Sequence, residues 1–185
     1  MRVLSVQVGR PRTVSWNGKK ISTSIFKSPV LGRVPSSGNN LAGDRQSDPR
    51  MHGGELKAIY VYPHEHYPYW ETVLETKLDF GAFGENITTQ ELLETNVSPG
   101  DRFQIGSLEL IATQPRMPCY KLGIRHNNDD MVRLFLEAER PGIYFQIAKH
   151  GDVGENDTIA LLQESSEQIS IVDLMRLKIQ KTRQL

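Results

Sequence analysis

The chain has 185 residues, enough for one domain whose hydrophobic core needs no covalent or metal cross-links. Its 22 lysines and arginines equal its 22 aspartates and glutamates, so no net charge draws it toward nucleic acid or an anionic membrane, and we expect neither as a partner. The single cysteine excludes an intramolecular disulfide, a CxxC redox motif and a cysteine-based zinc or iron–sulfur site, and fits a reducing, cytoplasmic location.

The first third of the chain predicts β structure followed by long loops. Residues 1–8 alternate apolar and polar side chains and predict a strand, with no signal-peptide pattern. Residues 13–26 predict a hairpin, because Asn17-Gly18 supplies the two positive φ values of a type I′ turn. From residue 27 to residue 54 the composition of Gly, Pro, Ser, Asn and Asp indicates long loops broken by short strands. Loops of this length are usually functional or disordered.

The middle of the chain predicts a buried strand and then a helix. Residues 58–62 are apolar and aromatic enough for a buried strand that ends at Pro63. Residues 65–75 predict a helix with Pro68 in its first turn or at a break. We expect three of its side chains to face the core: Tyr69, Val73 and Leu74. A loop with two glycines follows at residues 80–87, where the backbone can approach a ligand closely.

The second half predicts further strands and two helices. Strands are expected at residues 102–105, 108–113, 143–148 and 157–162, and a helix is expected to begin near Met131 and to stop at Pro141-Gly142. A last helix over residues 171–183 is predicted by Ser170 as its N-cap and Asp173 as the partner of that cap. Many short strands with few helices predict a mainly β domain, a barrel or a sandwich, over residues 1–163, with a helical extension over residues 164–185.

The single cysteine lies in a stiff segment from Gln114 to Lys121 that contains two prolines. Each proline fixes its own φ and removes a donor, so we expect a rigid loop and neither a helix interior nor a central strand. Arg116 and Lys121 give Cys119 a cationic neighbourhood that would favour its thiolate, the form that binds metals or attacks electrophiles. The alternative is a small buried hydrophobe, since cysteine without a disulfide is often buried.

Other polar residues are candidates with weaker signals. His64-Glu65-His66 is either a metal pair or a solvated start of the helix, and its spacing favours the second. His52 stands in a polar loop and either contacts a ligand or lies on the surface. Cys119 could form a hydrolase dyad with His126 or His150, but no orienting residue is evident. Five cations either converge on an anion or are simply solvated: Arg45, Lys57, Arg116, Lys121 and Arg125. Phosphate binding would need such side chains, because no Walker loop or GxGxxG motif is present.

Several sequence blocks, taken together, resemble the MOSC domain found at the C-terminus of molybdenum cofactor sulfurase, in its small bacterial YiiM-like branch. The resemblance covers residues 1–163. It is carried by Gly43-Asp44-Arg45-Gln46, His52-Gly53-Gly54 with Lys57-Ala58, Gly81-Ala82-Phe83-Gly84-Glu85-Asn86, Gly100-Asp101, and Gln114-Pro115-Arg116-Met117-Pro118-Cys119.

The resemblance implies a MOSC-type β-barrel with a few peripheral helices and a short C-terminal helix. It also implies a molybdenum cofactor, a pyranopterin dithiolene with a terminal phosphate, whose metal is bound by Cys119. As catalytic residues beside Cys119 we test two acids, His52 and Glu85. The residues expected to contact the cofactor are Arg45, Lys57, Asn86, Arg116, Lys121 and Arg125.

Such proteins reduce N-hydroxylated compounds, including hydroxylamines, amidoximes and N-hydroxylated bases, a detoxification reaction. The sequence has no flavin, nicotinamide or iron–sulfur pattern, and pyridoxal phosphate is not predicted, so electrons are expected from a separate reductase. Longer relatives continue into a further helical region, which puts partner choice in doubt. The alternatives are a carrier of the cofactor or of sulfur without turnover, and a thiol enzyme without metal.

Overall fold

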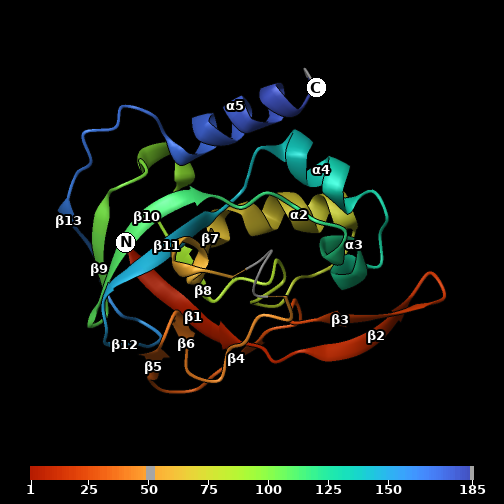
Figure 1. Cartoon of the computed structure of the whole chain (residues 1–185), viewed down its shortest axis with the longest axis horizontal. Helices are drawn as coiled ribbons and strands as arrows, with labels where there is room; N and C mark the ends of the chain where they lie inside the picture. The colour runs from red at the N-terminus through yellow and green to blue at the C-terminus, as the bar shows by residue number, and fades with distance from the viewer. Residues whose placement is uncertain (49–52, 184–185) are drawn as a thin grey trace.

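A single large sheet organises the chain, whose residues 1–48 and 53–183 are described by a computed structural model (Figure 1). Its eight strands run in the order β13-β9-β10-β11-β7-β8-β1-β4, and all neighbours are antiparallel except β7 and β8, which are parallel. The strands are β1 (Arg2–Val8), β4 (Ser28–Pro29), β7 (Ile59–Pro63), β8 (Ile87–Gln90), β9 (Arg102–Ile105), β10 (Leu108–Pro115), β11 (Ile143–Lys149) and β13 (Ile159–Gln163). The predicted mainly β class is confirmed.

The sheet curls until the start of β1 meets the segment that leads into β13. Val3 donates its backbone N–H to Asp157 O at 2.9 Å and accepts one from Asn156 at 2.9 Å, and Ile159 donates to Met1 O at 3.0 Å. These bonds join parts of the sheet that are distant in its strand order. No closed barrel is found among the described residues, so full barrel closure stays a prediction.

The hairpin and the short strands follow the local sequence signals. β2 (Arg12–Trp16) pairs with β3 (Lys19–Thr23), and the hairpin projects from the rest of the molecule in Figure 1. Asn17 and Gly18 have φ values of 48° and 74°, which confirms the predicted turn. The predicted loop contains β5 (Val34–Ser37) and β6 (Asn40–Leu41), which form a second sheet with β12 (Asp152–Val153).

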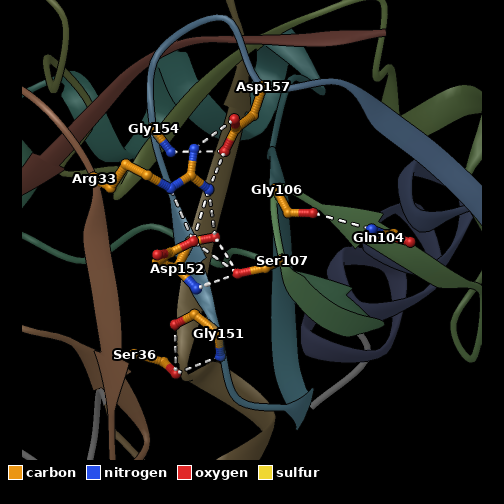
Figure 2. A network of polar contacts seen from close by, with 9 residues as sticks. All are labelled: Arg33, Ser36, Gln104, Gly106, Ser107, Gly151, Asp152, Gly154 and Asp157. Atoms are coloured by element: carbon orange, nitrogen blue, oxygen red, sulfur yellow. Dashed lines mark hydrogen bonds and ion pairs between the residues drawn. The ribbon is translucent and has the colours of Figure 1, made fainter.

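A polar network fastens this second sheet to the β9–β10 hairpin (Figure 2). The Arg33 guanidinium donates to Asp152 Oδ1 at 2.7 Å and to Asp157 Oδ1 at 2.9 Å, and Ser107 Oγ donates to Asp152 Oδ1 at 2.7 Å. Hydrogen bonding from Arg33 lowers the pKa of Asp152. Because the network is solvent-exposed, its role is to set the position of β12 and it adds little stability.

In the described part of the chain, four α-helices and three short 3-10 helices surround the sheet. Figure 1 shows α2, α3 and α4 gathered on one side, with α5 along the top of the view. Their bounds are η1 (Glu55–Lys57), η2 (His64–His66), α2 (Tyr67–Leu74), η3 (Glu94–Asn96), α3 (Lys121–His126), α4 (Met131–Ala138) and α5 (Ile171–Arg183). No described helix is long and apolar enough to cross a membrane.

The α2 helix is present with Pro68 in its first turn, but its predicted core face was wrong for Tyr69 and Val73, whereas Leu74 packs against the core as expected. Tyr67 and Trp70 are buried, whereas Tyr69 and Val73 are each 37% exposed. Tyr67 and Trp70 pack in an aromatic cluster with Phe83 and Phe135, distinct from the aliphatic core around the sheet. The helix therefore turns its bulkiest aromatic side chains inward.

His66 contradicts the expectation of a solvated start to this helix, because it is buried. Its Nε2 lies 2.8 Å from Glu94 Oε2, and its Nδ1 lies 2.8 Å from Arg140 Nη1. Arginine can only donate, so Nδ1 accepts and the Nε2 hydrogen is donated to Glu94. A metal pair is not supported either, because the described residues contain no cluster of three or more His, Cys, Asp or Glu side chains arranged for a metal.

The remaining helices include one that the sequence did not predict, α3. The predicted α4 ends at Ala138, three residues before the expected Pro141-Gly142 stop. The cap of α5 is confirmed: Asp173 donates its N–H to Ser170 Oγ at 3.1 Å. Ile171 of α5 is buried in the aliphatic core and Met175 in the aromatic cluster. The division of the chain at residue 163 stays a prediction.

Candidate functional site

A solvent-open pocket lies where loops from several parts of the chain meet. Its walls come from the end of β3 and the residues after it, from residues 44–47 after β6, from η1 and the start of β7, from Gly84 and Asn86 before β8, and from the segment between β10 and α3. The prediction that loops carry the site is therefore consistent with where the pocket lies.

The pocket brings together six of the predicted site residues: Arg45, Lys57, Asn86, Arg116, Cys119 and Lys121. Two others, Glu85 and Arg125, do not line it. The ninth, His52, falls outside the described residues. The roles of all nine remain predictions.

The cysteine segment is held at both ends by regular structure. Gln114 and Pro115 complete β10, where Pro115 pairs with Ile143, and Lys121 begins α3. The expectation that the whole segment is loop was therefore wrong at its ends, and Pro115 follows a shift in the strand register between Ala112 and Gln114. Cys119 is partly buried between these ends, and its backbone oxygen accepts the Leu122 N–H at 2.9 Å.

Arg116 supplies a buried donor that the described residues leave unsatisfied. The residue is 7% exposed, and its Nη1 has no hydrogen-bond partner there. The guanidinium carbon lies 5.1 Å from the centroid of the Tyr60 ring and 5.5 Å from that of Phe135. Stacking on these aromatic faces helps to hold the guanidinium in place. An oxyanion in the pocket would satisfy this donor.

Other cations surround the same space. Arg45 is exposed and Lys57 partly buried. Lys121 donates from Nζ to Ser47 Oγ at 2.9 Å, which ties α3 to the loop that carries Arg45. A ligand with several negative charges therefore fits the charge of the walls.

The floor holds a buried ion pair that sequence reasoning missed. Lys27 Nζ lies 2.7 Å from Asp44 Oδ2, with side chains 9% and 1% exposed. Burial lowers the pKa of Lys27, with a further lowering from the charge of Arg116 and an opposing effect from Asp44. Asp44 adjoins Arg45 in a block that the resemblance used, whereas no sequence signal distinguishes Lys27 from a surface lysine.

Both polar atoms of the Asn86 side-chain amide make hydrogen bonds within this floor. Its Nδ2 donates to Asp44 Oδ2 at 2.9 Å, and its Oδ1 accepts the Tyr60 N–H at 3.1 Å. Asn86 lines the pocket, but these bonds indicate that it positions Asp44 and β7.

Glu85 lies below the floor and does not reach the pocket. Its fully buried carboxylate accepts hydrogen bonds from the Gly81 N–H at 3.0 Å, the Phe83 N–H at 2.9 Å, the Thr88 hydroxyl at 3.1 Å and the Tyr67 hydroxyl. Both of its oxygens are engaged, by donors from the loop, from α2 and from β8. This geometry supports a structural role for Glu85 and gives no support to the catalytic role suggested for it.

Neither histidine proposed for a thiol dyad lines the pocket. His126 packs its ring 5.3 Å from Phe83, and burial, with the nearby charge of Arg125, lowers its pKa to about 4. His150 Nδ1 lies 2.8 Å from Ser36 Oγ, beside the second sheet. Arg125 lies with its guanidinium carbon 5.5 Å from the centroid of the Phe26 ring. The structure therefore places neither His126 nor His150 beside Cys119 as a base.

The side chains that line the pocket fit an anionic cofactor that carries its own metal ligands. Among the described residues the pocket offers one thiol, Cys119, and no group of metal-binding side chains surrounds it. A metal bound there by the protein alone would lack ligands, whereas one thiolate suffices for a metal whose other ligands belong to a cofactor. The unsatisfied Arg116 donor and the lysines suit the oxygens of such a group.

Comparisons with known proteins agree in family and fold. The MOSC domain model matches residues 48–160. The Bacillus subtilis protein YflK is 40% identical over 169 residues, which are 91% of this chain and 76% of YflK. Escherichia coli YiiM is 32% identical over 148 residues, 78% of this chain and 66% of YiiM. A Gibberella moniliformis protein named reductase is 32% identical over 178 residues, 94% of this chain but 31% of that protein.

A solved structure shows the same architecture. The crystal structure of YiiM from Geobacillus stearothermophilus superposes with a TM-score of 0.80 at 29% identity, over 97% of this chain and 84% of that one. The family model spans more than half of the chain, and YflK is similar over most of both sequences. The chain belongs to the MOSC domain family, and its relatives include the YiiM proteins.

Proposed function

We propose that this chain binds a molybdenum cofactor in the pocket lined by Cys119 and reduces N-hydroxylated compounds there. The observation that carries the proposal is the pairing of a cysteine thiol with the unsatisfied buried donor of Arg116 in one pocket. The family and the reductase-named relative support an oxidoreductase role associated with this cofactor.

In this proposal Cys119 binds the metal, and its position is fixed because β10 and α3 hold both ends of a proline-containing segment. Arg116 donates to a cofactor oxyanion, and Arg45, Lys57 and Lys121 neutralise the phosphate and pterin oxygens. Arg125 lies outside the lining, so it acts at most through Phe26 and the residues beside it.

A bound cofactor would supply the two electrons that cleavage of the substrate N–O bond requires. The chain orients the substrate between the cysteine segment and the floor formed by Lys27, Asp44 and Asn86. Electrons come from a separate reductase, and the reaction detoxifies N-hydroxylated compounds.

Metal and pterin analysis tests this proposal. Wild-type protein, Cys119→Ala and Cys119→Ser would be purified gently from a host that makes the cofactor. We expect about one molybdenum and one pterin per wild-type chain and a large loss of molybdenum in both variants. Ser37→Ala, an exposed change on β5, is the matched control and should keep the wild-type content. Wild type without molybdenum, indistinguishable from Cys119→Ala, rejects both the reductase and the carrier and leaves the metal-free thiol enzyme.

A carrier without turnover is the second candidate, because the same pocket would serve storage. Loaded protein would be given a chemical reductant with benzamidoxime or N-hydroxylaminopurine. Formation of the amidine or the amine identifies the reductase. Full loading without product identifies the carrier.

A further inference from the structure

In the Lys27–Asp44 ion pair on the pocket floor, the carboxylate makes more hydrogen bonds than the ammonium does. Asp44 Oδ1 accepts the Gly9 N–H at 2.8 Å, and Oδ2 accepts both Lys27 Nζ at 2.7 Å and Asn86 Nδ2 at 2.9 Å. The carboxylate is thus held from three directions. The Lys27 ammonium has three hydrogens, and within residues 1–48 and 53–183 only Asp44 accepts one of them.

Two hydrogens of this nearly buried ammonium have no acceptor among the described residues. Lys27 lines the pocket although its side chain is 9% exposed. Taking a lysine out of water costs several kcal/mol, and a neighbouring carboxylate offsets only part of this cost. A pair kept only for stability would be expected to have its remaining donors satisfied by the protein. The two Lys27 hydrogens without an acceptor among the described residues therefore indicate that a ligand accepts them.

Other donors of the pocket are less suited to release a proton. The Tyr60 hydroxyl donates to Pro141 O at 2.7 Å, and Lys121 is bonded to Ser47. Burial raises the pKa of Tyr144, so its hydroxyl is a weaker acid than usual. Arg116 stays charged at all working pH values. Lys27 has its pKa lowered by burial, which makes its ammonium a better acid than an exposed lysine.

We propose that Lys27, held by Asp44, is the acid that protonates the leaving oxygen of an N-hydroxylated substrate. The inference rests on the proposed function. Reduction of an amidoxime breaks the N–O bond and consumes two electrons and two protons, giving an amidine and water. The electrons come from the reductase or from a chemical reductant through the cofactor. Lys27 gives one proton to the departing oxygen, the second proton comes from water, and Lys27 is reprotonated through the open side of the pocket.

The leaving group offers a test of this role. An O-acetyl amidoxime leaves as acetate, which needs no proton on its oxygen, so its reduction consumes one proton fewer. Lys27→Met should lower kcat/KM for benzamidoxime by about 10²- to 10⁴-fold, the usual contribution of a general acid, and that for O-acetyl benzamidoxime by less than about tenfold. Both substrates would be assayed with a chemical reductant, so that reductase docking plays no part.

Cofactor content and folding are measured on the same samples. Lys27→Met should keep the molybdenum and pterin content of wild type, with a cooperative thermal transition. Lys27→Arg, which keeps the charge but cannot release a proton, should lose benzamidoxime reduction to a similar extent. Lys19→Met on the β2–β3 hairpin removes an exposed lysine outside the pocket and should match wild type in every measurement.

Three results would overturn the proposal. Equal losses for the two substrates would show that Lys27 does not protonate the leaving oxygen. Loss of molybdenum in Lys27→Arg and Lys27→Met would make Lys27 a cofactor-binding residue. A selective loss in His52→Gln, with none in Lys27→Arg, would assign the acid to His52. Wild type that binds no cofactor rejects the proposed function itself and is recognised before any Lys27 variant is compared.

Discussion

Asn86 donates from Nδ2 to Asp44 Oδ2 at 2.9 Å and so joins two loops that are 42 residues apart in the chain. The same side chain accepts the Tyr60 N–H, which fixes the loops against the start of β7. The floor of the pocket is therefore built from long-range polar contacts. Because each partner is buried, removing one leaves the others without compensation.

Asp44→Ala should be strongly destabilising. It leaves the Lys27 ammonium buried without a counter-charge, and it removes the acceptor of the Gly9 N–H. We expect a loss of about 3–5 kcal/mol in the free energy of unfolding, as for other broken buried pairs. Asp130→Ala, which removes an exposed partner of Arg133, should cost at most about 1 kcal/mol. Urea unfolding at neutral pH measures both, and similar small losses would show that the Lys27–Asp44 pair is well solvated.

Glu85→Gln should lower stability without lowering cofactor content. Glutamine replaces one accepting oxygen by a donor, so at least one of the Gly81 and Phe83 N–H groups loses its partner. The expected cost is about 1–3 kcal/mol, the usual cost of one unsatisfied buried group. Molybdenum analysis and urea unfolding of the same sample separate the two effects. Unchanged stability with a large loss of turnover would restore Glu85 as a catalytic acid.

The features that the sequence predicted well are those that depend on neighbouring residues. The Asn17-Gly18 turn and the Ser170 cap need only short-range geometry. The face of α2 was predicted wrongly because aromatic residues occur all around its two turns, and only packing against Phe83 and Phe135 selects Trp70. The α3 helix was missed because it is six residues long and contains Gly123. A Cβ on that glycine would lie 2.8 Å from Asn128 O, so the glycine serves a close approach of the backbone.

The site residues that belong to a sequence motif could be predicted, whereas those that are distinguished only by their burial could not. The motif blocks contain Arg45, Asn86, Arg116 and Cys119, which line one pocket, although their roles stay predictions. Lys27 lies between the hairpin and a loop, where a solvated lysine is the usual expectation. Its burial comes from Asp44 and from residues far along the chain, which sequence patterns do not report. Glu85 is the opposite case, because its motif block suggested a site residue and the structure buries it completely.

His66→Leu should destabilise the connection between η2, η3 and β11. The change removes the donor to Glu94 and the acceptor for Arg140, while the Gly142 N–H remains bonded to Glu94 Oε1 at 2.6 Å. We expect a loss of about 1.5–3 kcal/mol, because both lost bonds involve a charged group. His150→Leu, at an exposed histidine, is the control and should change stability by less than about 0.5 kcal/mol. If the two variants unfold at the same urea concentration, the His66 network adds nothing to stability.

His126 should make the fold less stable in mild acid. Burial, followed by the charge of Arg125, lowers its pKa from 6.5 to about 4, so the folded protein keeps it neutral while the unfolded chain binds a proton. Above pH 6.5 both states are neutral and His126 has no effect. As the pH falls from about 6.5 to about 4 the unfolded state alone gains the proton, and the stability lost grows to about 3 kcal/mol before it levels off.

His126→Gln should remove this component. Carboxylates also titrate in the same range, so the informative quantity is the wild-type free energy of unfolding minus that of His126→Gln, measured by urea unfolding between pH 4 and pH 8. This difference should be constant above pH 7 and should fall in favour of the variant as the pH decreases, because a buried imidazole with no hydrogen-bond partner on Nε2 among the described residues resists protonation. His150→Gln, with an exposed ring, should show no such trend. A difference that stays flat to pH 4 would mean that His126 is hydrated and titrates normally in the folded protein.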